Sequence, residues 1–345
     1  QLLSAVLDKI TLSELSAEQV SNLLFADYMK MYLPLTKKRK RRIEDTTYAG
    51  YCENVGYPIE PYFRKSKVRL KDLTARDIQD FYDAQLERVK SNTVIHYHAI
   101  IRLALCYARK MGYIKENPIE QVEKPEKNKF VGTYCTSDEV NQLISFTKGT
   151  KLEIAVIFAC FYGIRRSECV GLRWSAFDFE NNIFHINHTV VLTSVNGKRT
   201  LVRKDAAKTD ATIRSMPLSA DIKKRLLEIK CMQENNKKRL KKNYNNQWTD
   251  YLMVTESGDL ISPDYVTDAF RRLVKKNKMR HIRFHDLRHT CASLLLNKGK
   301  GKVTMKDIQE WLGHSDYKTT ANIYAHLDLS SKYSSLETLD SIIEI

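Results

Sequence analysis

Residues 285–324 hold the side chains that are best suited to bind and attack an anion. His285, Arg288 and His289 are three and four residues apart, so a helix would present them on one face. His314 follows the Leu-Gly pair that ends the next apolar segment, and Tyr324 comes ten residues later. An arginine can bind an anion, a histidine can accept a proton and a tyrosine can act as a nucleophile. These residue types therefore indicate nucleophilic chemistry on an anionic substrate.

A zinc site is one alternative for this stretch, because His285-Asp286-Leu287-Arg288-His289 imitates the helical His-x-x-x-His of zinc proteases. That chemistry needs a glutamate at the second position as general base, and the shorter Asp286 occupies it. Arg288 would also be pressed against the cation. We therefore expect no metal and no other cofactor. Core histidines beside a surface arginine are the simplest interpretation of the segment taken alone.

Two further charged positions precede this stretch. Arg165 lies in the sequence Gly-Ile-Arg-Arg-Ser-Glu, after an apolar run that begins at Leu152. A buried charge is costly unless it is paired, so we expect Glu168 to hold Arg165 and to point it into a cleft. Lys208 lies in a polar break after strand-like sequence. A lone lysine in such a place is usually a solvated turn residue.

The composition indicates a polyanionic partner. The 345 residues carry 57 Lys plus Arg against 41 Asp plus Glu, a formal net charge of +16, and both halves of the chain are basic. Each phosphate that a cation neutralises releases counterions, so binding of DNA by both halves would be favourable and salt-sensitive. A run of six cations is either a phosphate clamp or a solvated loop, and we assign it to DNA binding. The run consists of Lys37, Lys38, Arg39, Lys40, Arg41 and Arg42.

The cysteines bear on the compartment. All seven are scattered without a Cys-x-x-Cys pair, and most lie in apolar runs, which implies a reducing compartment. Neither a signal peptide nor a membrane span is evident, and we expect no membrane partner. The chain begins with Gln, so we expect a fragment or a processed chain, with room for a further domain upstream.

Hydrophobic patterning predicts a mainly α fold with a small antiparallel β-sheet. Residues 1–122 are predicted to form a helical domain, residues 123–134 a polar linker and residues 135–345 a mixed domain. Within the first domain, helices are expected from the capping box at Ser16 to Pro34, over residues 45–56 and 75–89, and from Asn92 to Gly112.

The second domain is expected to begin with a helix capped by Thr136. Residues 183–217 have strand composition with a hairpin turn at Asn196-Gly197, and Ser219 starts a basic helix that runs to about Lys242. Another helix is expected from Pro263. A buried helical segment over residues 291–296 then follows the histidine and arginine positions.

Taken together, these residues resemble the tyrosine recombinases and integrases. The resemblance covers the mixed domain in full and the helical domain loosely. The short polar N-terminal part and the tail look more like phage and conjugative-transposon integrases than chromosome-dimer resolvases. The family's elements occur here in order as Gly-Ile-Arg-Arg-Ser-Glu with Arg165, Lys208-Thr209, His285-x-x-Arg288, Leu312-Gly313-His314 and Tyr324.

The resemblance implies metal-free cleavage and rejoining of DNA strands through a 3′-phosphotyrosyl intermediate, in the integration and excision of a mobile element. It implies a helical core-binding domain and a catalytic domain that form a C-shaped clamp on double-stranded DNA. By the same resemblance, Arg165 and Arg288 clamp the scissile phosphate, His314 hydrogen-bonds it, and Tyr324 attacks it. His285 accepts the phenol proton, and Lys208 protonates the departing 5′-oxygen. Glu168 holds Arg165, and Asp286 and His289 orient their helix.

The resemblance also implies a monomer that assembles as a homotetramer on two DNA sites. Residues 336–345, with apolar positions at helical spacing, would form a C-terminal helix exchanged between protomers. A DNA-bending or directionality protein would be an accessory partner, and the expected location is the bacterial cytoplasm, at the nucleoid. The alternatives are a chromosome-dimer resolvase, a type IB topoisomerase acting as a monomer, and a DNA-binding relative that has lost a catalytic residue.

Overall fold

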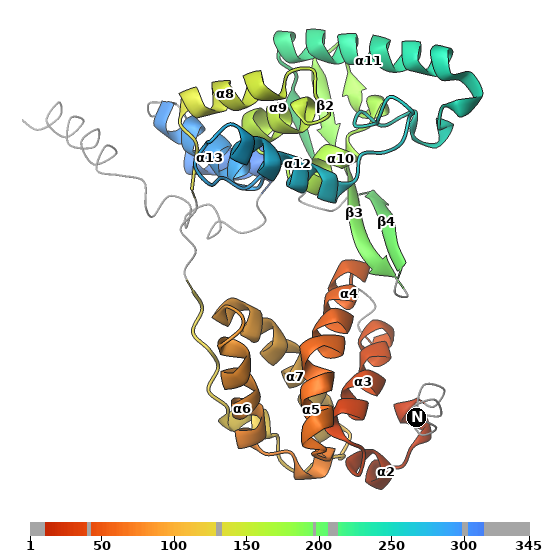
Figure 1. Cartoon of the computed structure of the whole chain (residues 1–345), viewed down its shortest axis with the longest axis vertical. Helices are drawn as coiled ribbons and strands as arrows, with labels where there is room; N and C mark the ends of the chain where they lie inside the picture. Colours follow the sequence, from red (N-terminus) through yellow and green to blue (C-terminus); the bar gives the residue numbers. More distant parts are fainter. Residues whose placement is uncertain are drawn as a thin grey trace, which may run out of the picture. The chain divides into compact units, whose positions relative to one another are not determined.

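The computed structural model describes residues 11–39, 43–128, 133–195, 198–205, 213–298 and 303–313. The chain forms two compact units, residues 1–130 with 193–199 and residues 131–192 with 200–345. The helices and strands of both units are drawn in Figure 1, and each unit has its own hydrophobic core. The predicted mainly helical fold with small antiparallel sheets is confirmed. The predicted turn at Asn196-Gly197 and the predicted helix at residues 336–345 lie outside the described residues.

Helices of the first unit pack around an aromatic core in which Phe25, Phe63 and Phe81 are fully buried. The capping box at Ser16 is confirmed, a second capping box is present at Thr74, and the left-handed Gly112 follows the last long helix as expected. The described helices are α2 (Ala17–Ser21), α3 (Phe25–Arg39), α4 (Asp45–Asn54), α5 (Glu60–Ser66), α6 (Ala75–Leu86) and α7 (Ser91–Lys110), with a π-helical turn η2 (Val55–Ile59) between α4 and α5.

Several sequence-based boundaries in this unit are wrong. The helix expected from Ser16 is interrupted between α2 and α3, and the helix expected over residues 75–89 ends at Leu86. Pro34 does not end its helix but lies inside α3, where buried residues on both sides outweigh the lost backbone hydrogen bond. Asn92 does not cap α7, which begins at Ser91, because the Asn92 amide pairs with the backbone of Asn128 instead. The helix expected over residues 45–56 ends at Asn54, and the chain continues through η2 into α5, which the patterning missed.

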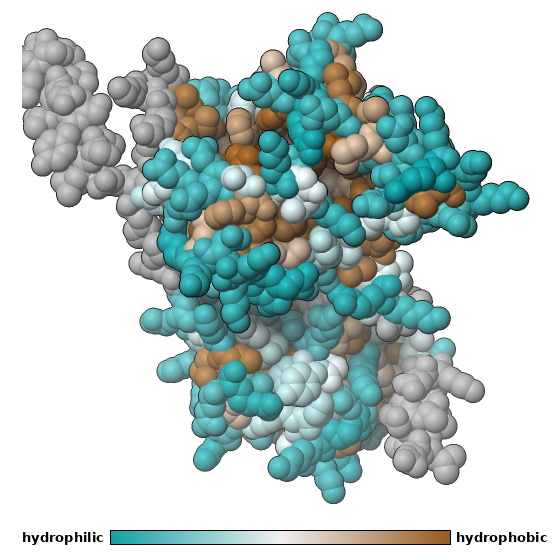
Figure 2. Space-filling model, turned by 45° about the horizontal axis from the view of Figure 1, so that its top comes forward, coloured by the Kyte–Doolittle hydropathy of each residue, from teal (hydrophilic) through white to brown (hydrophobic). Residues whose placement is uncertain are grey.

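The second unit is built on α9 (Glu153–Tyr162), a helix buried on nearly all sides. It contacts α8 (Ser137–Thr147), α10 (Arg166–Gly171) and α13 (Asp286–Lys298). Helix α14 (Met305–Leu312) packs on α13, and α12 (Pro263–Lys276) packs on α10. The long basic helix α11 (Ala220–Leu240) ends two residues before the expected Lys242. Figure 1 shows this unit, and Figure 2 shows hydrophilic side chains over most of the face in view.

Five strands accompany these helices, and they form two sheets in the described residues. Strands β1 (Phe177–Asp178), β2 (Ile183–Ile186) and β5 (Arg214–Pro217) pair antiparallel in the order β1-β2-β5. Opposite Ile186 stands Arg214, so the alternation of β5 points Arg214 and Met216 inward. Strands β3 (His188–Val195) and β4 (Lys198–Asp205) form a separate pair.

No helix in the described ranges combines the length and the apolarity needed to cross a lipid bilayer.

Candidate active site

A sharp turn between α9 and α10 places Arg165. Helix α9 ends at Gly163, whose φ of 59° is left-handed, and a Cβ there would clash with the Leu312 side chain of α14. Two residues later Arg165 is the N-cap of α10. Glu168, at the third position of that helix, accepts hydrogen bonds from the Arg165 backbone nitrogen at 2.7 Å and from its Nη1 at 2.8 Å. The expected pairing of Arg165 with Glu168 is present.

Arg214 is a third arginine of this site, and the sequence reasoning missed it. Its side chain is buried, and its Nη2 donates to Glu168 Oε2 at 3.1 Å. The sequence did contain a signal for Arg214, because a charged residue at an inward position of the alternating strand β5 requires a buried partner. Gly313 allows the close approach of Arg214, since a Cβ there would lie 2.8 Å from Arg214 Nη1.

Arg288 is buried at the meeting point of two helix ends. Its side chain is 2% exposed, and its guanidinium donates to the Gly163 carbonyl at the end of α9 and, at 2.6 Å, to the Leu312 carbonyl at the end of α14. A cation satisfies these terminal carbonyls and the negative end of each helix dipole. Burial, followed by the nearby charge of Arg165, lowers the pKa of Arg288 to about 9, which leaves it protonated at neutral pH.

The cluster of Arg165, Arg214 and Arg288 around Glu168 carries a net positive charge. Burial raises the pKa of Glu168, but the guanidiniums of Arg214 and Arg165 outweigh it, and the net pKa lies below the ordinary range. Three guanidiniums therefore face one ionised carboxylate. The excess positive charge is carried by guanidiniums that hydrogen bonds hold in place, and it is suited to bind an anion such as a phosphate.

Arg165 is the member of the cluster that reaches a solvent-accessible pocket. Its side chain is 35% exposed, whereas the other two arginines are buried. A pocket of about 250 Å³ is lined by Arg165, Ser167 and Glu168 on one side and by residues 186–189 on the other. Arg165 Nη2 also donates to the Gly313 carbonyl at 3.2 Å, so the residue before His314 lies within the cluster.

His285 and His289 lie at the start of α13, with ring centroids 5.2 Å apart and ring planes nearly perpendicular. His285 is exposed, yet desolvation by the surrounding protein atoms, followed by the charges of His289 and Arg288, lowers its pKa to about 4. His285 is therefore neutral at pH 7 and able to accept a proton. His289 is partly buried, and its Nδ1 has no hydrogen bond within the described residues.

Asp286 fixes the turn that precedes α13. Its carboxylate accepts hydrogen bonds from the Arg283 backbone and guanidinium and from Thr133 Oγ1. Thr290, one turn later, donates to the Asp286 carbonyl and accepts from the Cys135 backbone nitrogen. These contacts support the interpretation of Asp286 as a residue that orients the helix. Within the described part of the chain, no three His, Cys, Asp or Glu side chains gather as a metal site would require.

The structure thus brings Arg165, Glu168 and Arg288 together, with His285, Asp286 and His289 at one end of α13. The segment expected to be buried after them is less so, since Leu294, Leu295 and Leu296 are only partly covered. Lys208, His314 and Tyr324 lie outside the described residues.

The six-cation run is described only in part. Lys37 forms an ion pair with Asp45 at 2.9 Å and lies 5.3 Å from the centre of the Tyr48 ring. Lys38 and Arg39 belong to the last turn of α3, and Lys40, Arg41 and Arg42 lie outside the described residues.

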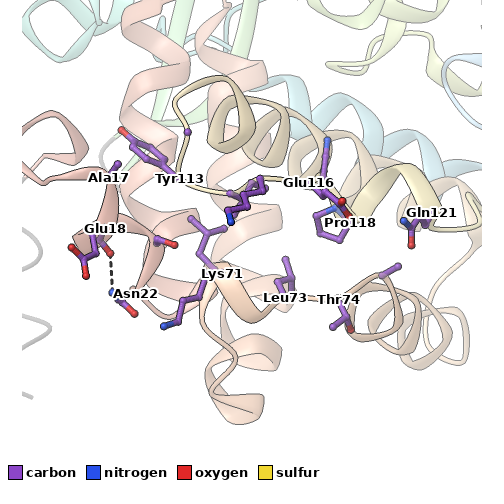
Figure 3. Close-up of a pocket in the computed structure, with 17 residues that line it drawn as sticks. Ala17, Glu18, Asn22, Lys71, Leu73, Thr74, Tyr113, Glu116, Pro118 and Gln121 are labelled. Atoms are coloured by element: carbon purple, nitrogen blue, oxygen red, sulfur yellow. Dashed lines mark hydrogen bonds between the residues drawn. The ribbon is translucent and has the colours of Figure 1, made fainter.

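A larger pocket, of about 740 Å³, lies in the first unit and contains none of the candidate residues (Figure 3). Lys71, Glu18 and Glu116 line it with charges of both signs. Asn22 donates to the Glu18 carbonyl at its edge. A mixed, open lining of this kind offers no convergent catalytic groups, so the pocket is not a candidate active site.

Replacing Glu168 by Gln is expected to destabilise the protein by about 3 kcal/mol, because it removes the charge that compensates the buried Arg214. The measurement is urea unfolding of the full chain. Glu139→Gln is the matched control, since Glu139 holds the same helix position in α8 and pairs with Arg280 at the surface, and it is expected to cost less than about 1 kcal/mol. Equal losses in the two variants would contradict a special role for the buried pair.

Residues 133–330, more than half of the chain, match the phage integrase family, and residues 24–86 match the phage integrase N-terminal SAM-like domain. The chain is 25% identical over 307 residues to a tyrosine recombinase XerC-like protein of Caldanaerobacter subterraneus subsp. tengcongensis, covering 86% of this chain and 77% of the relative. It is 24% identical over 308 residues to the ICEBs1 integrase of Bacillus subtilis, covering 85% and 78%.

The fold is similar to that of a solved Tn1549 transposon integrase in complex with a circular intermediate DNA. The TM-score is 0.67 at 18% identity, and the match covers 90% of this chain and 99% of the integrase chain. At this identity the likeness shows the fold.

Proposed function

This chain belongs to the phage integrase family and is a tyrosine recombinase that acts on DNA in site-specific recombination, and we propose that Tyr324 is its nucleophile. The phenol oxygen of Tyr324 attacks the scissile phosphorus, and the bond from phosphorus to the 5′-oxygen breaks. The resulting 3′-phosphotyrosyl bond conserves the energy of the phosphodiester, so the strand can be rejoined to another end without ATP. The similarity to integrases of mobile elements supports integration and excision as the biological reaction.

Each candidate residue has a role that follows from its chemistry. His285 accepts the Tyr324 proton, and Lys208 gives a proton to the departing 5′-oxygen. Arg165 and Arg288 stabilise the charge that grows on the non-bridging oxygens, with His314 as a further hydrogen-bond donor. Glu168 positions Arg165. Asp286 and His289 position the start of α13.

The observation that carries these roles is the guanidinium cluster around Glu168. Arg165 from α10 and Arg288 from α13 both donate to carbonyls at the end of α14, at Gly313 and Leu312. Fixed donors of this kind need no reorganisation when negative charge develops. The next residue along the chain is His314, so a candidate catalytic residue follows the cluster directly.

Trapping of the covalent adduct tests the assignment. A DNA duplex with a nick next to the cleavage position loses its short 5′-hydroxyl fragment after attack, so rejoining is prevented and the adduct accumulates. Peptide mapping by mass spectrometry should place the DNA on Tyr324. Attachment to any other side chain would contradict the proposed nucleophile.

The pH dependence of cleavage should reflect the low pKa of His285. A base must be neutral, so at DNA concentrations below saturation the rate should persist as the pH falls through 6.5 and decline only towards pH 4. Because the folded-state pKa is lowered, the unfolded chain binds the proton first, and stability decreases as the pH falls from about 6.5 towards 4. Circular dichroism must confirm folding at each pH. A decline centred at 6.5 in folded protein would contradict this role.

Recombination between two duplexes cuts four strands, and each cut needs one tyrosine. We therefore propose that four copies assemble on two DNA sites, with residues 336–345 docked on a neighbouring copy. Lys37, Lys38, Arg39, Lys40, Arg41 and Arg42 would contact the DNA backbone, so both units would hold the duplex. The site of action would be the bacterial nucleoid, and a DNA-bending or directionality protein would be an accessory partner.

A further inference from the structure

A polar cluster joins the first residue of β3 to the last residue of β4. His188 is buried, and its Nδ1 lies 2.7 Å from Asp205 Oδ1. On the other side of the ring, Nε2 lies 2.9 Å from the Tyr251 hydroxyl. Thr189 Oγ1 also donates to the Lys204 carbonyl, at 3.4 Å. The open end of this two-stranded ribbon is thus held by side chains as well as by its backbone.

Asp205 has a second partner, the cation Arg173, whose Nη2 donates to Asp205 Oδ1 at 2.8 Å. Arg173 is itself fixed by a β-bridge to Tyr251. Next to it, the Trp174 backbone nitrogen donates to the Asp250 carbonyl at 2.6 Å. Outside the ribbon, the Asp205 carboxylate is therefore tied directly to Arg173 and, through His188, to Tyr251.

The same cluster is coupled to the helix that carries Arg165. Gly171, the last residue of α10, packs so closely on the start of β3 that a Cβ would lie 2.6 Å from the His188 carbonyl oxygen. His188 and Arg165 line the same pocket. Helix α10 thus has the phosphate-binding candidate at its first turn and the ribbon at its last residue.

The hydrogen bonds of His188 specify one tautomer. Burial lowers the pKa of His188 although Asp205 opposes this, so the ring is neutral at pH 7. A carboxylate can only accept, and therefore Nδ1 donates to Asp205 while Nε2 accepts from the Tyr251 hydroxyl. The chain from Tyr251 through His188 to Asp205 has one consistent direction of donation, which favours a single geometry.

We propose that Asp205, held by His188 and Arg173, is a positioning residue for Lys208. This rests on the proposed function, in which Lys208 protonates the leaving oxygen. Three residues of extended chain span at most about 10 Å, so fixing Asp205 limits where Lys208 can reach. Asp205 touches neither the DNA nor the proton. It sets the starting point of the segment that delivers the proton.

The test separates proton delivery from every other step. In cleavage, the bond between phosphorus and the 5′-oxygen breaks and the oxygen takes a proton from the Lys208 ammonium. When the 5′-oxygen is replaced by sulfur, the leaving thiolate is stable without that proton. A variant with misplaced Lys208 should therefore cleave oxygen-bridged DNA slowly and sulfur-bridged DNA normally. A variant damaged elsewhere should be slow on both substrates.

Asp205→Asn is the test variant, because the Asp205 side chain is 69% exposed and Asn has the same size. Asp268→Asn is the matched control, since Asp268 also pairs with an arginine Nη2, that of Arg271, and is half-exposed on α12. In single-turnover cleavage, Asp205→Asn should be about 10²-fold slower on oxygen-bridged DNA and within about threefold of the unmodified protein on sulfur-bridged DNA. Asp268→Asn should match the unmodified protein on both.

Lys208→Ala distinguishes failure of this inference from failure of the proposed function. If sulfur restores cleavage by Lys208→Ala but not by Asp205→Asn, Lys208 is the acid and Asp205 does not position it. An unchanged rate for Asp205→Asn on oxygen-bridged DNA would also overturn the positioning role. If the sulfur substitution fails to restore cleavage by Lys208→Ala, the proton comes from another group. The assignment of Lys208 as the acid and the inference built on it are then both wrong.

Discussion

The Tyr324→Phe variant is expected to form no covalent adduct with DNA and to bind its target with unchanged affinity. Only the attacking oxygen is removed, while the aromatic ring remains. The measurement combines adduct trapping on nicked DNA, resolved on a denaturing gel, with a binding titration on intact duplex. Recombination should be lost together with the adduct, because both strand exchange and rejoining proceed through the phosphotyrosyl bond.

Tyr265→Phe is a suitable control for this experiment. Tyr265 is an exposed tyrosine of α12, remote in sequence from the candidate residues, so the same loss of one hydroxyl should leave adduct formation at the normal level. If Tyr324→Phe still forms the adduct, the nucleophile is another residue. If binding is lost in parallel, the hydroxyl serves DNA recognition rather than attack.

Replacing Arg288 by Lys is expected to slow cleavage by about 10²–10³-fold, equivalent to about 3 kcal/mol of transition-state stabilisation. Lysine keeps the positive charge but loses the planar fork that can serve several acceptors at once. In this protein the fork also joins the ends of α9 and α14 through Gly163 and Leu312. Arg288→Lys should therefore also lower the stability, by about 2 kcal/mol.

Arg165→Lys separates the effect on the cleavage rate from the effect on stability. Arg165 is partly exposed and does not lie in the core, so its replacement should slow cleavage to a similar degree with a smaller loss of stability. Single-turnover rates and urea unfolding of both variants give the comparison. If Arg288→Lys loses stability but cleaves at a normal rate once folded, its role is confined to packing. If neither variant slows cleavage, the phosphate is held elsewhere.

The identity of the candidate residues and much of the secondary structure could be predicted from the sequence. Thr136 with Glu139 predicted the start of α8 and Gly313 the end of α14, because caps depend on residues a few positions apart. Likewise, the Arg165–Glu168 pair was predictable, since both belong to one helical turn. The errors at Pro34 and Asn92 arose where tertiary contacts outweighed local preference.

What the sequence by itself determined about this protein is its family pattern, its helical and strand segments and its basic charge, because each depends on residue type and short-range spacing. Only the tertiary structure decided that Arg214, 46 residues from Glu168, shares its carboxylate. The same holds for Arg288, which joins the ends of two helices from a fully buried position. Burial and long-range pairing arise when distant segments pack together, so a local pattern can mark Arg214 as an inward charge but cannot identify its partner.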